Sequence, residues 1–118
     1  MTALAHKPLR LDVRREGGAA VVKVSGSVSI SDANRLREQL EALAGEKVPV
    51  IVLELSEMDF ISSLGLGAII SGHLKCRHHR GQIKLVNPTA AVRELLETTR
   101  LTKLFGVYGS VEQAVRQA

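Results

Sequence analysis

Two adjacent serines, Ser62 and Ser63, stand in the segment DFISSLGLGAII, residues 59–70, between two apolar stretches. A serine hydroxyl can cap a helix by accepting a hydrogen bond from a backbone N–H group. It can also be phosphorylated, which adds up to two negative charges. The residues alone leave both interpretations open: the pair only starts a helix, or one serine is there to be modified.

A catalytic serine needs a base within hydrogen-bond reach. The nearest histidine along the expected helix is His73, which follows Ser63 by ten residues, or about 15 Å of helix. The segment ISSLG also lacks the first glycine of a Gly-x-Ser-x-Gly elbow. We therefore predict that the protein is not an enzyme.

Three histidines and a cysteine in the same region are possible metal ligands: His73, Cys76, His78 and His79. At 100° per residue, His78 and His79 point away from His73, so four ligands cannot converge. A single cysteine also excludes an internal disulfide and a multi-cysteine site. We expect no metal and no cofactor, with Cys76 as a small helix side chain.

The length of 118 residues suits one domain with one core, so we expect a single domain over residues 1–118. Aromatic residues are only 3% of the chain, which leaves Leu, Val, Ile and Ala to build that core. The N-terminus lacks the apolar run of a signal peptide, and no segment approaches the roughly 18 apolar residues of a membrane span. We expect a cytoplasmic protein without membrane insertion, as a monomer or weak dimer.

The net charge of +4 is unevenly distributed. Residues 60–93 contain five Lys or Arg residues and no Asp or Glu, whereas the rest of the chain sums to −1. The window lacks interleaved aromatic residues and any recognition-helix motif, so we expect no specific nucleic-acid partner.

The first half of the chain predicts a hairpin, a helix and a buried strand. Apolar and polar residues alternate on both sides of Gly17-Gly18, as in a β-hairpin. Ser31 is the expected N-cap of a helix that ends at Gly45. Its core face should carry Ala33, Leu36, Leu40 and Leu43. The β-branched run over residues 48–55 predicts a strand in the middle of the sheet.

The second half alternates helices and strands. Ser62 or Ser63 should open a helix that runs to about Arg80, and strands are expected at residues 82–87 and 104–109. A third helix should start with Asn87 as N-cap and Pro88 at its first position, and a last helix at Ser110. This order predicts an α/β fold: a small mixed sheet, with an N-terminal hairpin plus parallel strands, packed with about four helices.

A helical projection assigns two faces to the helix after the serines. The expected core face carries Leu66, Ile69, Ile70, His73, Leu74 and Arg77. The expected outer face carries Leu64, Ala68, Ser71, Lys75, His78 and His79. Glycines at 65, 67 and 72 cost roughly 1 kcal/mol each relative to alanine. A close approach of another backbone, or tight packing of the helix on its own sheet, should offset that cost.

The order of elements resembles the STAS domain family of bacterial anti-sigma-factor antagonists over nearly the whole chain. MDFISSLGLG, residues 58–67, is similar to that family's strand-to-helix segment with its Asp-Ser-Ser/Thr-Gly-Leu-Gly motif. Aligned on Gly65-Leu66-Gly67, the phosphorylated serine of the family falls on Ser63, with Ser62 as second choice, and the family Asp falls on Ser62. The family's Gly-Glu-Leu-Asp segment is here GSVS, which places Ser27 and Ser29 at its two acidic positions.

The resemblance implies a partner-switching antagonist. The unphosphorylated protein would bind a serine-kinase anti-sigma factor and be released by phosphorylation of Ser63, and a serine phosphatase would reverse the modification. The expected partner-binding residues are Ser27, Ser29, Ser62, Leu64, Gly65, Ala68, Ser71 and Lys75. The alternative is a STAS scaffold or adaptor that binds a protein without a phosphorylation cycle. In that case the basic helix face is interpreted as a docking surface for an acidic partner or a nucleotide.

Overall fold

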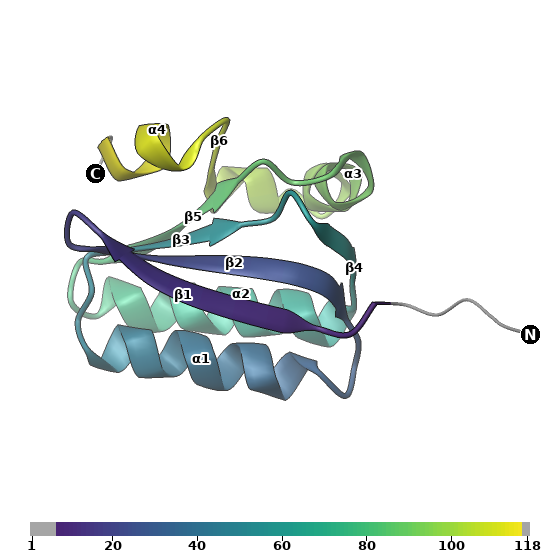
Figure 1. Ribbon diagram of the computed structural model, residues 1–118, viewed down its shortest axis with the longest axis horizontal. Coiled ribbons are helices and arrows are strands. Elements are labelled where there is room, and N and C mark those ends of the chain that lie inside the picture. The colour runs from purple at the N-terminus through teal and green to yellow at the C-terminus, as the bar shows by residue number, and fades with distance from the viewer. Residues whose placement is uncertain (1–6, 117–118) are drawn as a thin grey trace, which may run out of the picture.

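The computed structural model describes residues 7–116, which form a six-stranded mixed sheet with helices on both faces (Figure 1). The strands are β1 (Arg10–Glu16), β2 (Ala19–Val28), β3 (Val50–Glu54), β4 (Met58–Ile61), β5 (Gln82–Val86) and β6 (Gly106–Tyr108). The helices are α1 (Ala33–Gly45), α2 (Ser63–Arg77), α3 (Ala90–Thr98), the short 3-10 helix η1 (Leu101–Lys103) and α4 (Val111–Arg116). The predicted α/β class with four α-helices is confirmed.

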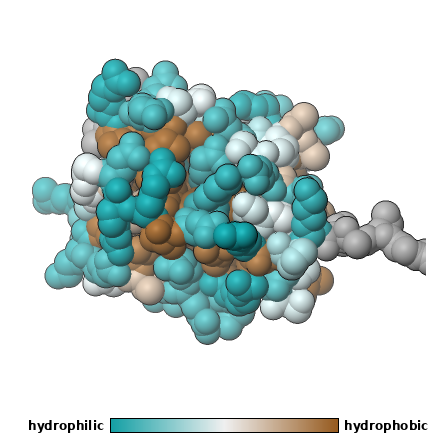
Figure 2. All heavy atoms as spheres, in the orientation of Figure 1, coloured by the Kyte–Doolittle hydropathy of each residue, from teal (hydrophilic) through white to brown (hydrophobic). Residues whose placement is uncertain are grey.

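Strands β1 and β2 form the predicted hairpin, antiparallel and in register from Arg10 opposite Ser25 to Glu16 opposite Ala19. Gly17 and Gly18 both have positive φ, at 56° and 85°, as a two-residue turn of this handedness requires. Strand β1 is an edge strand, and most of its side chains are exposed and charged. Figure 2 shows that the face carrying β1 and α1 is largely hydrophilic, which opposes edge-to-edge pairing.

The parallel part of the sheet has β3 at its centre, between β2 and β5, as the sequence predicts. Strand β2 is long enough to pair with two strands in turn. Its first half pairs with β3, and after an irregularity at Gly26/Ser27 its second half pairs with β4. The residue pattern did not separate β4 from the strand expected at residues 48–55, although the resemblance to a strand-to-helix segment places a strand here; β4 ends directly before Ser62.

Two hydrophobic clusters lie on opposite faces of the sheet. Helices α1 and α2 cover one face and enclose the larger cluster, and α4 covers the other face (Figure 1). The predicted stripe on α1 is confirmed, since all its members are buried: Ala33, Leu36, Leu40 and Leu43. Helix α3 packs beside β4 and adds Val92 and Leu96 to the larger cluster.

Two predicted helix starts are wrong. The N-cap of α1 is Asp32, because Ser31 bonds to the Ser29 hydroxyl instead, at 3.0 Å. The N-cap of α3 is Thr89, whose hydroxyl accepts a bond from Val92 N–H. Asn87 has a φ of +51°, a left-handed conformation that differs from the extended backbone of an N-cap residue, so Pro88 does not open the helix either.

The predicted core face of α2 is confirmed in part: Ile69 and His73 are buried, and Leu66 and Ile70 are half-buried against the core, but the face is rotated so that Leu74 and Arg77 lie outside it. The buried residues are Gly65, Ala68, Ile69, Gly72, His73 and Cys76. Leu74 is 55% exposed, and Arg77 is exposed as well. The projection gave weight to large apolar side chains, whereas the helix turns Gly65 and Gly72 inward and so approaches the sheet and α1 closely. The helix ends at Arg77, three residues earlier than expected.

Within residues 7–116, none of the helices combines the length and the apolar character that a membrane crossing requires.

Candidate functional site

The two serines at the start of α2 have different environments. Ser62 is the N-cap: its hydroxyl accepts a hydrogen bond from Gly65 N–H at 3.1 Å, and its own N–H donates to Val28 O at 2.8 Å. Ser62 is only 7% exposed. Ser63 is the first helical residue, is exposed, and makes no side-chain hydrogen bond to the described part of the chain. Ser62 therefore serves the fold, and the Ser63 hydroxyl is available.

The start of α2 favours negative charge. The first turn of the helix contains no acidic residue. The backbone N–H groups of Ser63 and Leu64 belong to the four that an α-helix leaves without intrahelical partners. An anion at such a position is stabilised by about 0.3 to 1 kcal/mol. A phosphate on Ser63 is compatible with the fold.

Apolar side chains surround the serines on the surface. Ile30, Phe60 and Leu64 are 66%, 45% and 48% exposed, although each is a large apolar residue. An open hollow of about 530 Å³ lies beside Ser62, and Ile30 and Phe60 line it with Ser29 and Ser31. We name this surface the serine face: Ser29, Ile30, Ser31, Phe60, Ser62, Ser63 and Leu64.

Ser29 fixes the loop that carries Ile30. Its hydroxyl donates to the Asp32 carboxylate at 2.9 Å and accepts from Asp32 N–H at 3.2 Å. It also lies 3.0 Å from the Ser31 hydroxyl. This local hydrogen bonding holds the loop before α1 in one conformation and presents Ile30 to solvent.

Four of the predicted partner-binding residues are buried: Ser27, Gly65, Ala68 and the helix cap Ser62. Ala68 is fully buried, because α2 is rotated relative to the projection. Gly65 faces inward, and a Cβ there would lie within 2.8 Å of side-chain atoms of Ile61 and Val28. Ser27 is 3% exposed, and its hydroxyl finds no hydrogen-bond partner among the described residues. Contrary to expectation, Ser27, Gly65 and Ala68 therefore lie inside the fold, whereas Ser62 still lines the hollow of the serine face.

The other predicted residues divide along α2. Leu64 lies beside Ser63 and is exposed, and Ser29 lies on the serine face. Ser71 is half-buried, and Lys75 approaches Glu41 of α1. Lys75 is twelve residues from Ser63, about 18 Å along the helix, so it does not belong to the serine face.

The sequence reasoning missed Ile30 and Phe60. Phe60 is one of only two phenylalanines and directly precedes the ISS segment, which was a usable signal. Its exposure depends on β4, in which Asp59 and Phe60 are both exposed between buried ends. Ile30 follows a strand that is almost wholly buried, so its sequence context favoured a core position.

The possible metal ligands are distributed between core and surface. His73 is 4% exposed, its Nδ1 accepts a hydrogen bond from Ile83 N–H at 3.1 Å, and its ring packs edge-on against Phe105. Burial, and to a lesser extent the nearby Arg77, lower the pKa of His73. Burial raises the pKa of the Cys76 thiol. Among residues 7–116 no three His, Cys, Asp or Glu side chains gather as metal ligands would.

The fold and the site define a class of protein: small α/β domains in which a helix that begins with serines follows the carboxyl end of a parallel strand. The sequence model of the STAS domain family matches residues 10–114 of the chain. The chain therefore belongs to the STAS domain family, as the sequence motif indicated.

Similar proteins include several antagonists of anti-sigma factors. The chain is 24% identical over 110 residues to the anti-sigma F factor antagonist of Paenibacillus polymyxa, which covers 92% of this chain and 94% of that protein. The crystal structure of an anti-sigma factor antagonist from Mycobacterium paratuberculosis has a TM-score of 0.84 at 26% identity, over 93% of both chains. The Bacillus cell fate determinant SpoIIAA in its phosphorylated form has the same fold, with a TM-score of 0.71 at 15% identity, over 93% of this chain and 98% of that one.

Proposed function

We propose that this protein is an anti-sigma-factor antagonist that works by partner switching at Ser63. With Ser63 unmodified, the serine face binds a serine-kinase anti-sigma factor. The kinase transfers the γ-phosphoryl group of ATP to the Ser63 oxygen, the hydroxyl proton passes to solvent, and ADP and the phosphorylated protein are both released from the kinase. A serine phosphatase hydrolyses the phosphoserine with water and regenerates the hydroxyl and inorganic phosphate.

The observation that carries this proposal is the division of roles between the two serines. Ser62 caps the helix and is buried, so Ser63 is not needed for capping and is exposed at the first helical position. Exposed Leu64 lies next to it in the chain, and exposed Phe60 precedes it by three residues. A modifiable hydroxyl is thus presented within an apolar surface that a partner can cover.

The physical chemistry of that arrangement gives a switch. A phosphate on free Ser63 is solvated and is favoured by the helix N-terminus. The same group beneath a bound partner must lose its water, which costs several kcal/mol unless the partner supplies cations. A penalty of about 3 kcal/mol weakens binding more than a hundredfold.

The names of the relatives support an anti-sigma factor as the partner, since two of them are antagonists of such factors. SpoIIAA, which shares the fold, has a phosphorylated form. In this role the chain is a substrate and a binding partner rather than a catalyst. His73, the histidine that follows Ser63 on α2, is buried and accepts a hydrogen bond from Ile83 N–H.

A scaffold without a phosphorylation cycle is the second candidate. Serines stand at both positions where the family motif carries acids: Ser27 is buried, and Ser29 bonds within its own loop. A kinase that recognises its substrate through those two acidic side chains lacks both contacts in this protein. The serine face then binds its partner irrespective of the state of Ser63.

Capture of partners from lysates of the native cells distinguishes the two candidates. Immobilised protein with Ser63→Ala should retain the anti-sigma factor, and Ser63→Asp should lose it by at least about tenfold, because the carboxylate is desolvated in the interface. Quantitative mass spectrometry of the bound proteins gives the ratio.

The matched control for that experiment is Ala90→Asp, which places the same charge at the exposed first residue of another helix, α3. This variant should capture partners as well as the unmodified protein does. Equal capture by Ser63→Ala and Ser63→Asp would contradict the switch and favour the scaffold.

A further inference from the structure

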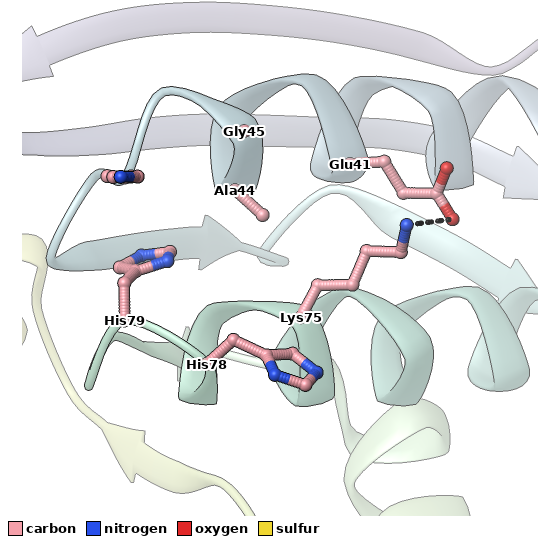
Figure 3. Close-up of a pocket in the computed structure, with 7 residues that line it drawn as sticks. Glu41, Ala44, Gly45, Lys75, His78 and His79 are labelled. Atoms are coloured by element: carbon pink, nitrogen blue, oxygen red, sulfur yellow. Dashed lines mark ion pairs between the residues drawn. The ribbon is translucent and has the colours of Figure 1, made fainter.

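A groove lies at the opposite end of α2 from Ser63, between the C-terminal ends of α1 and α2 (Figure 3). We name it the C-terminal groove. Ala44, Gly45 and Lys47 line one side, and Lys75, His78 and His79 line the other. Its volume is about 460 Å³, within the range of small-molecule sites. The switch at Ser63 does not use it, and it includes Lys75, His78 and His79 of the basic helix face, for which the sequence left the ligand open between an acidic partner and a nucleotide.

The groove has an excess of positive charge. Lys47 is exposed and makes no ion pair within residues 7–116. Lys75 approaches Glu41 on the rim, but at 3.9 Å, with the two side chains 54% and 33% exposed. An exposed pair of this kind contributes little. The next acid along the chain, Glu46, does not line the groove and lies 3.0 Å from Arg15.

One wall of the groove is fixed. His79 Nε2 lies 3.0 Å from Val48 O, and because a carbonyl only accepts hydrogen bonds, this nitrogen carries the proton. The same ring lies so close to Gly81 that a Cβ there would come within 2.8 Å of it. The imidazole is thereby held in one orientation.

The space between the charged groups is apolar. In Figure 3 the Ala44 methyl points from α1 into the gap between the helices, and Lys75 crosses that gap toward Glu41. A Cβ on Gly45 would meet no atom within 4 Å. Positively charged side chains near helix C-termini interact favourably with the helix dipoles, and this effect explains why lysine and histidine occur here. The same effect does not explain the apolar hollow between those side chains.

We propose that the C-terminal groove binds a small organic phosphate. The phosphate lies between the ammonium groups of Lys47 and Lys75, and an apolar ring lies against Ala44 and the edge of His79. Lysine is a common point-charge ligand of phosphate, and the helix separates this site from Ser63 by about 20 Å. The groove is therefore a second site, independent of the partner-switching role.

An NMR titration with 1-naphthyl phosphate tests the proposal. At low ionic strength, the amide signals of residues 41–48 and 75–81 should shift and saturate together. 1-Naphthol, which lacks the charge, and inorganic phosphate, which lacks the ring, should each bind about tenfold more weakly or worse, because each keeps only half of the interaction.

Variants test which side chains are responsible. Lys47→Gln/Lys75→Gln should weaken binding about tenfold, since each exposed ion pair contributes a factor of roughly two to five. Glu41→Gln should tighten it about twofold, because Lys75 loses its competing acid. Arg93→Gln/Lys103→Gln removes the same charge from exposed positions elsewhere and should bind as the parent does.

Three results would overturn the proposal: no saturable shift in residues 41–48 and 75–81, shifts centred on the serine face, or equal weakening in the two double variants. Should the Lys47/Lys75 variant fail to fold, Glu41→Gln still decides, since unchanged affinity in that variant contradicts the proposed role of Lys75.

Discussion

The adjacent serines at the start of α2 have different environments and therefore different possible roles. Ser62 gives its hydroxyl to Gly65 N–H and is buried, whereas Ser63 is exposed and has no side-chain partner among the described residues. The question posed by the sequence, capping or modification, thus has a different answer for each serine. Capping belongs to Ser62, and modification of Ser63 stays a prediction.

Replacing the cap should destabilise the protein. Ser62→Ala removes the acceptor of Gly65 N–H and should lower the free energy of unfolding by about 1 kcal/mol, or roughly 4 °C in Tm. Ser63→Ala should change the free energy of unfolding by less than about 0.5 kcal/mol, because the Ser63 hydroxyl makes no hydrogen bond within residues 7–116. Urea denaturation followed by circular dichroism measures both. Equal losses in the two variants would contradict the assignment of the cap.

Buried His73 should make stability depend on pH. Its Nδ1 accepts a hydrogen bond from Ile83 N–H, so the neutral ring is the native form, and burial together with Arg77 lowers its pKa. The unfolded chain takes up that proton near pH 6.5, before the folded chain does. The contribution of His73 to the free energy of unfolding is therefore fully present above about pH 6.5, and it decreases as the pH falls toward the pKa of His73 in the folded protein.

The measurement is the free energy of unfolding between pH 7.5 and 5.0 for the parent and for His73→Gln. The parent should lose more stability over this range than the variant, because glutamine has no proton to take up. Parallel curves for the two proteins would show that His73 does not cause the dependence.

At the scale of elements, the glycines determine how α2 packs. A Cβ on Gly65 would meet Ile61 and Val28 within 2.8 Å, and one on Gly72 would meet Leu40 at 3.0 Å. A Cβ on Gly67 would meet nothing within 4 Å. Two of the three glycines therefore allow close packing, against the sheet at one and against α1 at the other, while Gly67 only lowers helix propensity.

Alanine substitutions should separate these roles. Gly65→Ala should destabilise the protein by about 1 to 3 kcal/mol, because the added methyl overlaps buried side chains. Gly67→Ala should stabilise it by about 0.5 to 1 kcal/mol through helix propensity. The midpoints of thermal unfolding give the signs. A stabilised Gly65→Ala variant would mean that the helix does not pack as described.

Elements with a clear repeating pattern could be predicted from the sequence. The hairpin at Gly17-Gly18 and the buried stripe of α1 follow from regular alternation and spacing. Helix α2 could not be oriented in the same way, because its inward glycines carry no hydrophobic signal. The residue pattern alone did not predict β4, because Asp59 and Phe60 interrupt its burial, and the exposure of Phe60 was missed.

At the scale of the molecule, the two ends of the α1–α2 layer differ in character. The serine face lies at the helix starts, where exposed apolar residues surround a modifiable hydroxyl. The C-terminal groove lies at the helix ends, where lysines and histidines gather. The acid-free window of the sequence overstated the basic surface, because Lys84 is buried, donates to Ala114 O at 2.8 Å and lies over the Tyr108 ring.

The modification state of Ser63 in the native cells tests the switch most directly. Protein recovered from growing and from stressed cells would be digested with trypsin, and the peptide of residues 48–75 sequenced by mass spectrometry with site localisation. Partner switching predicts phosphate on Ser63, at an occupancy that changes between the two conditions, and none on the capping Ser62. An unmodified Ser63 in every condition, or phosphate on Ser62 instead, would contradict it.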